Sequence, residues 1–188
     1  YRGEDHVALT YIGDGAMQQG AVYEAMELAT LWSLPCVLLI ENNYYAMGTA
    51  LDRYSFLTDL SKRGAGVGMK HWQFDGYDVQ EVYDNVKRAV DHARSGKGPV
   101  IIEALTYRYR GHSMSDPAKY RKDGELEDAQ ARDCLQKAED DLAALGVDAA
   151  ACEKIRNEVN VIAQDAYDFA DESAEPDPAK LYDYTYAG

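Results

Sequence analysis

Short apolar runs separated by helical patterns constrain the fold of this chain more than any other feature. Three runs rich in apolar residues are short enough to be strands, namely Val7 to Ile12, Cys36 to Ile40 and Val100 to Leu105. The second is continuously apolar, as expected of a parallel strand that is covered on both faces. Strands that alternate with helices predict an α/β fold with an open parallel sheet flanked by helices.

Helical patterns fill the intervals between these runs. The first predicted helix ends at Pro35 and has one apolar face, made of Ala21, Ala25, Leu28 and Trp32. Asp78 is the predicted N-cap of the second helix, with Glu81 three residues on as in a capping box. The apolar face of this helix consists of Val79, Val82, Val86, Val90 and Ala93. We expect an irregular loop from Tyr44 to Gly68.

The last third of the chain is acidic, and we expect it to be helical. Two helices should meet near Gly146, with apolar stripes made of Leu135, Ala138, Leu142 and Leu145 and of Ile155, Val159 and Ile162. An extended arm should run from Pro176 through Tyr186. We therefore predict an α/β region over residues 1–124 and a helical tail with an extended arm over residues 125–188. The α/β region is expected to be truncated at its start, because the first residue is Tyr1 and not Met.

Composition argues against several classes of function. The chain of 188 residues has a formal net charge of −14, whereas proteins that bind nucleic acid carry clustered Lys and Arg. No apolar run approaches the roughly 20 residues of a membrane span, and the start lacks a hydrophobic signal region. The three cysteines form no CxxC pair and suit a reducing compartment. Neither nucleic acid nor a membrane is an expected partner.

Polar residues follow the first two predicted strands. Gly13, Asp14 and Gly15 follow the first strand, and Asn42 and Asn43 come shortly after the second. The carboxyl ends of parallel strands share one edge of a sheet, where such folds bind ligands. A Gly-rich turn before a helix offers N–H groups to a diphosphate, and carboxylate and amide oxygens suit Mg²⁺. A Gly-Asp-Gly turn alone is common, but the pair of motifs at this spacing indicates a site for a diphosphate and Mg²⁺.

This pair of motifs resembles the fingerprint of thiamine diphosphate enzymes. The resemblance implies that Asp14, Asn43 and the backbone carbonyl of Tyr45 hold Mg²⁺. It also implies that the turn begun by Gly13 binds the cofactor, with the backbone N–H groups of Gly15 and Ala16 facing the diphosphate.

A second motif runs from Tyr107 to Pro117 and contains His112 beside Ser113. A single histidine after a strand is more often structural than catalytic. The segment is similar, however, to the phosphorylation loop of the pyruvate dehydrogenase E1α family, in which the histidine reaches the cofactor and the next serine is the regulatory site. The resemblance makes His112 the candidate catalytic residue and Ser113 a candidate phosphorylation site. The match runs from about Val7 to Arg121 and is looser in the acidic tail.

The resemblance implies an activity and partners. The family carries out thiamine-diphosphate-dependent oxidative decarboxylation of pyruvate and transfers the acetyl group to the lipoyl group of E2. Its α subunit forms an α2β2 heterotetramer with an E1β subunit, which supplies the glutamate that faces the aminopyrimidine. Where animal members have a second loop serine, this chain has Ala118 and Lys119 before Tyr120. That departure makes two-site kinase control doubtful and favours a bacterial cytoplasm over a mitochondrial matrix.

Three alternatives stay open at the level of sequence. The chain could be the α subunit of a branched-chain 2-oxo acid or acetoin dehydrogenase, which differ in the loop around His112. A Rossmann-type nucleotide-binding domain would need G-x-G-x-x-G after the first strand, which the residues from Gly13 to Gln18 do not supply. A non-catalytic acidic interaction module would leave the residues at the strand ends unexplained.

Overall fold

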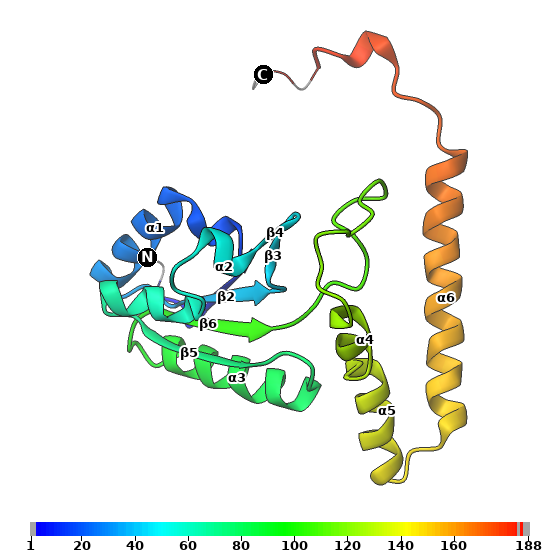
Figure 1. The fold of residues 1–188 in the computed structure, drawn as a ribbon. Helices are drawn as coiled ribbons and strands as arrows, with labels where there is room; N and C mark the ends of the chain where they lie inside the picture. Colours follow the sequence, from blue (N-terminus) through cyan, green and yellow to red (C-terminus); the bar gives the residue numbers. More distant parts are fainter. Residues whose placement is uncertain (1–2, 184, 186–188) are drawn as a thin grey trace. The chain divides into compact units, whose positions relative to one another are not determined.

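The computed structural model describes residues 3–183 and 185 of the chain. Contacts divide it into two units, one that ends at Ala138 and one that begins at Glu139. The first is an α/β unit and the second is helical (Figure 1). The predicted regions, 1–124 and 125–188, were separated by their expected roles in cofactor binding. The division by contacts does not test those roles, so the two regions stay a proposal.

A parallel sheet lies at the centre of the first unit. Its four strands are β1 (Ala8–Gly13), β2 (Cys36–Asn42), β5 (Lys70–Asp75) and β6 (Val100–Leu105). Their order across the sheet is β1-β2-β6-β5. Every pairing in this sheet is parallel, which confirms the predicted fold class. Strand β5 was not predicted. It lies at an edge of the sheet, and Phe74 is its one buried residue, so it lacks the apolar run that marks the central strands.

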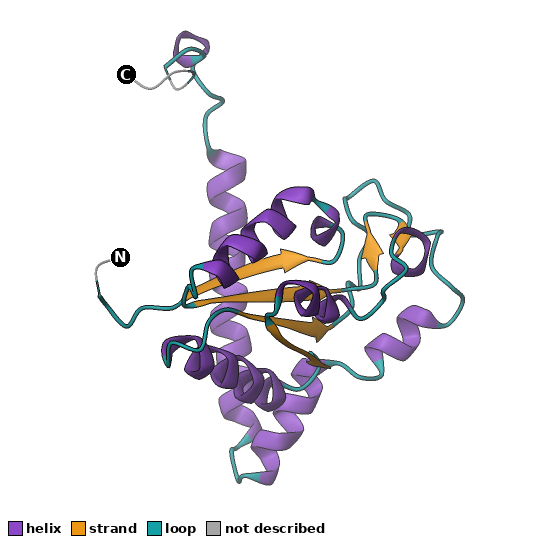
Figure 2. Ribbon diagram, turned by 90° about the vertical axis from the view of Figure 1, so that its left-hand side faces the viewer, coloured by secondary structure: helices purple, strands orange, loops and turns teal. Residues whose placement is uncertain are grey.

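Helices cover both faces of the sheet (Figure 2). On one face, α1 (Gly20–Leu31) and the 3-10 helix η2 (Leu60–Val67) enclose a core that includes Met26, Ile40 and Ile101. On the other face, α3 (Val79–Arg94) packs on a core that includes Val37, Leu39, Val100 and Ile102. Because side chains alternate along a strand, β2 and β6 contribute to both cores.

The predicted apolar face of α1 is wrong. Its buried residues are Met26 and Ala29, whereas Leu28 is 44% exposed and Trp32, just after the helix, is 62% exposed. Apolar residues occur around most of this helix, so periodicity alone did not show which side faces the sheet.

The predicted N-cap of α3 is confirmed. The side chain of Asp78 accepts hydrogen bonds from the backbone N–H groups of Gln80 at 2.9 Å and Glu81 at 3.1 Å. The capping box is incomplete, because the Glu81 carboxylate accepts from the N–H of Asp75 at 3.4 Å instead of from that of Asp78. Most of the predicted face packs on the core, and Val79 at the start of the helix is exposed.

The segment predicted as an irregular loop contains short elements. A hairpin of β3 (Tyr45–Ala46) and β4 (Thr49–Ala50) leads into α2 (Leu51–Tyr54). In Figure 1 this hairpin lies beyond the arrowhead of β2, at the edge of the sheet where ligands bind in such folds.

Helices dominate the rest of the chain. They are α4 (Glu125–Gln130), α5 (Cys134–Ala144) and α6 (Ala149–Glu172), followed by the 3-10 turn η3 (Pro178–Lys180). As predicted, the chain turns between α5 and α6 at Gly146, which has a φ of 85°. The arm that was predicted to be extended contains the 3-10 turn η3. Tyr184 and Tyr186 lie outside the described residues.

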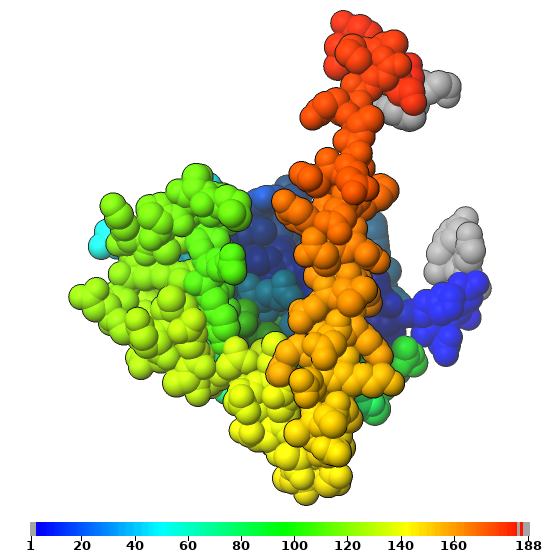
Figure 3. Space-filling model, turned by 90° about the vertical axis from the view of Figure 1, so that its right-hand side faces the viewer, coloured from blue at the N-terminus to red at the C-terminus, as the bar shows by residue number. Residues whose placement is uncertain are grey.

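The apolar stripes of α5 and α6 are exposed. No described residue of either helix is buried, and Ile155 and Ile162 are 60% and 67% exposed. In Figure 3 the side chains of α6, in orange, stand out along the helix. Within the described part of the chain, no helix has both the length and the apolar character needed to cross a membrane.

Candidate functional site

The register of the sheet brings the predicted motifs to one edge. Gly13, the last residue of β1, lies opposite Glu41 of β2, and Asn42 lies opposite Leu105 of β6. Asp14 and Asn43 therefore leave neighbouring parallel strands at the same end of the sheet. The side chain of Asn42 is fully buried at this end.

Asp14 is a buried carboxylate, only 2% exposed. It accepts a hydrogen bond from the hydroxyl of Tyr54 at the end of α2. Burial, together with this bond, raises the pKa of the Tyr54 phenol, so the phenol remains a donor at neutral pH. No cationic side chain among residues 3–183 and 185 forms an ion pair with Asp14. A buried carboxyl group that has no cationic side chain beside it leaves oxygen atoms that a bound cation could contact.

The corner after β2 is held by two asparagines. Asn42 Oδ1 accepts the N–H of Tyr44 at 2.9 Å, and Asn43 Oδ1 accepts the N–H of Tyr45 at 3.1 Å. Tyr44, which follows the two asparagines, has a φ of 68°, a left-handed conformation that is uncommon outside glycine. An amide oxygen has two lone pairs, so Asn43 keeps one that could face a cation.

The Gly-Asp-Gly turn packs directly on the hairpin that follows this corner. A Cβ atom built on Gly15 would lie 2.8 Å from the Cβ of Ala46, closer than such atoms approach one another. Gly15 also begins the 3-10 turn Ala16–Gln18, where the N–H groups of Gly15 and Ala16 were predicted to face a diphosphate. The structure thus brings the two motifs together in one corner.

Carboxylate, amide and carbonyl oxygens are the predicted metal ligands in this corner, and they are of the kind that suits Mg²⁺. In the described ranges, no cluster of three or more His, Cys, Asp or Glu side chains could hold a metal. The predicted ligand set has one carboxylate, Asp14, and Mg²⁺ held by so few protein groups usually takes phosphate oxygens and water as further ligands. The ligand roles of Asn43 and Tyr45 stay a prediction.

The loop that carries His112 is joined to the same hairpin. Arg108 donates from Nη2 to the carbonyl of Met47 at 2.8 Å, and its Nη1 lies 3.4 Å from His112 Nδ1. The ring of Tyr120 lies 5.2 Å from that of Tyr45 and packs against Gly48. His112 is exposed beside this hairpin, and its catalytic role stays a prediction.

Asp116 organises the His112 loop. Its carboxylate accepts the N–H of His112 at 2.7 Å, the hydroxyl of Tyr120 at 2.7 Å and the N–H of Ala118 at 2.8 Å. These hydrogen bonds lower the pKa of Asp116 to about 2, and the bond from the His112 N–H has the largest effect. Ser113 is exposed, with its Oγ 3.1 Å from that of Ser115.

Sequence reasoning assigned no role to three polar residues that support this corner, although Asn42 is part of the second motif. They are Asn42, Tyr54 and Glu103, of which Asn42 and Glu103 are fully buried. Burial raises the pKa of Glu103, against the effect of its hydrogen bonds. The sequence did contain a signal for Glu103, which is a charged residue within an otherwise apolar strand. Such a group is rarely buried without partners, so the signal predicts that polar partners surround it. Tyr54 had no comparable signal in the sequence.

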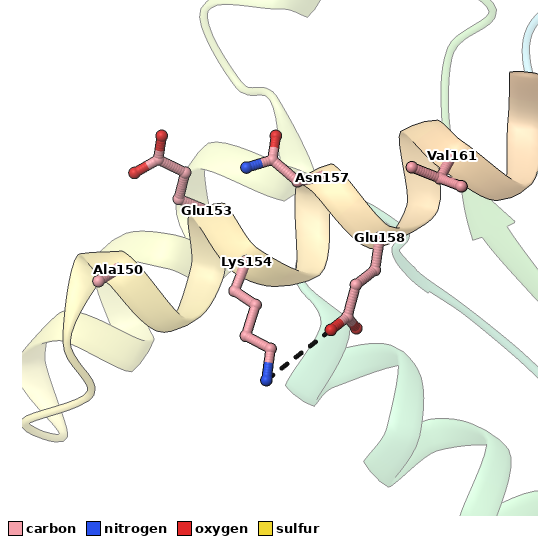
Figure 4. Close-up of a pocket in the computed structure, with 6 residues that line it drawn as sticks. All are labelled: Ala150, Glu153, Lys154, Asn157, Glu158 and Val161. Carbon is pink, nitrogen blue, oxygen red and sulfur yellow. Dashed lines mark ion pairs between the residues drawn. The ribbon is translucent and has the colours of Figure 1, made fainter.

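A surface hollow on α6 offers a contrast with this corner. Figure 4 shows that its lining residues all come from one helix and that Lys154 and Glu158 point toward each other. Their ion pair measures 3.8 Å. The lining consists of Ala150, Glu153, Lys154, Asn157, Glu158 and Val161. Because polar groups from other elements do not converge there, the hollow is not a candidate active site.

Comparison with known proteins identifies the family. A family profile described as "Dehydrogenase E1 component" matches residues 1–179. The chain belongs to the dehydrogenase E1 component family. This confirms the family that was predicted from the two motifs.

Curated relatives bear names of one enzyme component. The chain is 48% identical to the pyruvate dehydrogenase E1 component subunit alpha of Rhizobium meliloti over 97% of its own length and 53% of the relative's. For the Zymomonas mobilis protein of the same name the identity is 45%, with 97% and 52% covered. For the mitochondrial somatic form of Bos taurus it is 40%, with 95% and 45% covered. The chain thus spans about half the length of the curated relatives it matches.

Proposed function

We propose that this chain is part of the α subunit of a pyruvate dehydrogenase E1 component. The subunit would act in an α2β2 heterotetramer with an E1β partner, decarboxylate pyruvate oxidatively and transfer the acetyl group to the lipoyl group of E2. The family depends on thiamine diphosphate, and this chain would bind the diphosphate half of the cofactor through Mg²⁺.

One observation supports this proposal most strongly. The Gly-Asp-Gly turn and the Asn42–Tyr45 corner end neighbouring parallel strands and pack against each other through Gly15 and Ala46. The buried Asp14 lies in that turn without a cationic partner among the described residues. The relatives named above favour pyruvate over branched-chain 2-oxo acids and acetoin.

The residues of this chain would have separate roles. Asp14, Asn43 and the carbonyl of Tyr45 would hold Mg²⁺, while the turn from Gly13 to Ala16 would bind the diphosphate through backbone N–H groups. When bound, thiamine diphosphate supplies the carbanion chemistry, and the protein supplies position, charge and exclusion of water.

The first experiment is an assay of pyruvate-dependent reduction of an artificial electron acceptor. It uses the full-length α chain purified with its β partner, with and without thiamine diphosphate and Mg²⁺. We expect activity with pyruvate that requires both, and loss of that activity in Asp14→Ala. Asp84→Ala, which changes an exposed aspartate on α3, is the matched control. A preference for branched-chain substrates or acetoin would change the substrate, and failure to bind the cofactor would refute the proposal.

We further propose that His112 assists acetyl transfer to the lipoyl group. This rests on the resemblance of its loop and on the attachment of that loop to the hairpin through Arg108. We expect His112→Ala to lower activity with lipoylated E2 more than decarboxylation measured with the artificial acceptor. Unchanged rates in both assays would refute the role.

Ser113 is the proposed phosphorylation site. Its carbonyl accepts the N–H of Asp116 at 3.1 Å, so a phosphate of about two negative charges would be added to a turn that contains an ionised carboxylate. We expect Ser113→Glu to lower activity and to increase proteolysis of the loop, and Ser113→Ala to do neither. Unchanged activity and proteolysis in Ser113→Glu would count against the site.

The Rhizobium and Zymomonas relatives are bacterial, and we propose a bacterial cytoplasm, not a mitochondrial matrix, as the compartment. Fractionation of source cells, with the chain detected by antibody, would test this.

A further inference from the structure

Glu103 lies at the centre of a buried hydrogen-bond network beneath the candidate site. Its side chain is fully buried in β6. Oε1 accepts from Asn42 Nδ2 at 2.6 Å, while Oε2 accepts from the N–H of Ser61 at 3.0 Å and from Gln73 Nε2 at 3.1 Å. These three partners are donors to the two carboxylate oxygens, and the Asp59 carboxylate also lies near Glu103.

This arrangement allows only one orientation of the Asn42 amide. Its nitrogen must face Glu103, so its oxygen faces the other way and accepts the N–H of Tyr44. A flipped amide would place an oxygen against the carboxylate and a nitrogen against an N–H group. The first contact would have no donor and the second would have no acceptor, which is unfavourable for a side chain that is completely buried.

We infer that Glu103 is a positioning residue for the proposed Mg²⁺ and diphosphate site. It acts through Asn42, whose oxygen holds Tyr44 in its left-handed conformation at φ 68°. That conformation determines the path of the backbone from Asn43 to Tyr45, on which the proposed metal ligands lie. The inference rests on the proposed function, but the network itself can be measured without the cofactor.

Exchanging the carboxylate of Glu103 and the amide of Asn42, by the variants Glu103→Gln and Asn42→Asp, gives a sharp test. In Glu103→Gln the new amide nitrogen faces a donor, whether it points toward Asn42 or toward Ser61 and Gln73. In Asn42→Asp two carboxylates meet at hydrogen-bond distance. In the double variant, the oxygen of the introduced glutamine would accept from Ser61 and Gln73, and its nitrogen would donate to the introduced aspartate. The other oxygen of that aspartate would accept from Tyr44. Every hydrogen bond of the network is then restored, with the polarity of the bond between the two exchanged side chains reversed.

The experiment uses the full-length α chain with its β partner. Two quantities are measured: hydrogen exchange at the Tyr44 and Tyr45 amides without cofactor, and the affinity for Mg²⁺ with thiamine diphosphate by calorimetry. We expect each single variant to accelerate exchange and to weaken Mg²⁺ binding about tenfold, the scale of one lost hydrogen bond to a charged group. The double variant should return both quantities to within about threefold of the wild type. Gln80→Ala, at an exposed glutamine of α3 whose side chain donates to Asp84 and not to this network, should leave both within about twofold.

Several outcomes would overturn the inference. It is refuted if Glu103→Gln leaves exchange at Tyr44 and Tyr45 unchanged, or if a folded double variant is no better than the single variants. Should the single variants not fold, a folded double variant with exchange like the wild type supports the inference, and an unfolded one refutes it. A wild-type protein that binds no thiamine diphosphate would refute the proposed function instead, and amide exchange would still decide the role of Glu103.

Discussion

At the scale of single residues, Tyr54 determines the surroundings of the Asp14 carboxylate. Its hydroxyl donates to that carboxylate from the end of α2. In Tyr54→Phe a buried carboxylate loses this donor, so we expect the free energy of unfolding to fall by about 1.5–3 kcal/mol. Urea unfolding at neutral pH measures the change. Tyr83→Phe, at a tyrosine that is 61% exposed, is the control and should be neutral. Equal stability of the two variants would contradict the prediction.

Asp116 makes the His112 loop sensitive to acid. Its pKa is lowered from 3.8 to about 2 in the folded chain, chiefly by the His112 N–H and the Tyr120 hydroxyl. A lowered pKa stabilises the loop fully above 3.8, and this effect is lost as the pH falls from 3.8 through about 2. We expect the carboxyl carbon of Asp116 to titrate near pH 2 by NMR.

Pepsin near pH 3, where Asp116 should still be about nine-tenths ionised, gives a functional check of the same prediction. The wild-type loop should resist cleavage there, and the loop of Asp116→Asn should not. Asp123→Asn, at an exposed aspartate, is the control. Equal cleavage of the wild type and Asp116→Asn would show that the carboxylate does not hold the loop.

Sequence analysis at this scale found the residues with a motif and missed their supports. Asp14 and Asn43 were located because their spacing is specific, and the structure brings their segments together. Tyr54 has no such spacing, because what matters is its contact with Asp14, which lies far away in the chain. Asn42 belongs to the second motif, but the spacing does not show that its side chain donates to Glu103. Glu103 was placed correctly in a strand. Its partner Ser61 lies in a segment predicted as an irregular loop, and its partner Gln73 lies in a strand that was not predicted.

At the scale of elements, the Gly-Asp-Gly turn and the β3–β4 hairpin are packed as one structure. A Cβ on Gly15 would meet Ala46 at 2.8 Å, whereas a Cβ on Gly13 would have nothing within 4 Å. We therefore expect Gly15→Ala to reduce the free energy of unfolding by about 1–3 kcal/mol through overpacking. Gly13→Ala, in the same motif, should change it by no more than about 0.5 kcal/mol. Urea unfolding compares them, and equal losses would mean that the turn and the hairpin can move apart.

The predicted elements were most accurate where both faces of a strand are apolar. Strands β2 and β6 were located closely, since they run between two cores. Strand β5 escaped prediction because only Phe74 of its residues is buried. The wrong face of α1 has a related cause. The exposed Leu28, and Trp32 just after the helix, are as apolar as the buried Met26, so hydrophobicity alone could not distinguish them.

At the scale of the whole molecule, the chain consists of two units of different character. The residues of both cores lie in the first unit, and none lies beyond Ala104. The apolar stripes of α5 and α6 were found from their periodicity, yet these helices bury no described residue. Periodicity shows that a helix has an apolar face but not whether anything within the same chain covers it.

This division predicts how the chain tolerates truncation. A chain that ends after Ala138 keeps both cores, so its free energy of unfolding should change by no more than about 1 kcal/mol. Trp32 and Trp72 both lie in the first unit, so their fluorescence during urea unfolding reports on that unit alone.

A shorter chain that ends after Arg121 is the matched control for this truncation. It also loses Glu125 and Asp133, which accept the hydroxyls of Tyr45 at 2.8 Å and Tyr109 at 2.9 Å. These acceptors anchor the hairpin and the His112 loop. Without the two bonds to charged groups and the packing around them, the free energy of unfolding should fall by about 2–4 kcal/mol. If the longer truncation product were as unstable as the shorter one, the segment from Glu139 onward would have to contribute to the folding of the α/β unit. The absence of buried residues among the described positions of α5 and α6 argues for the opposite result.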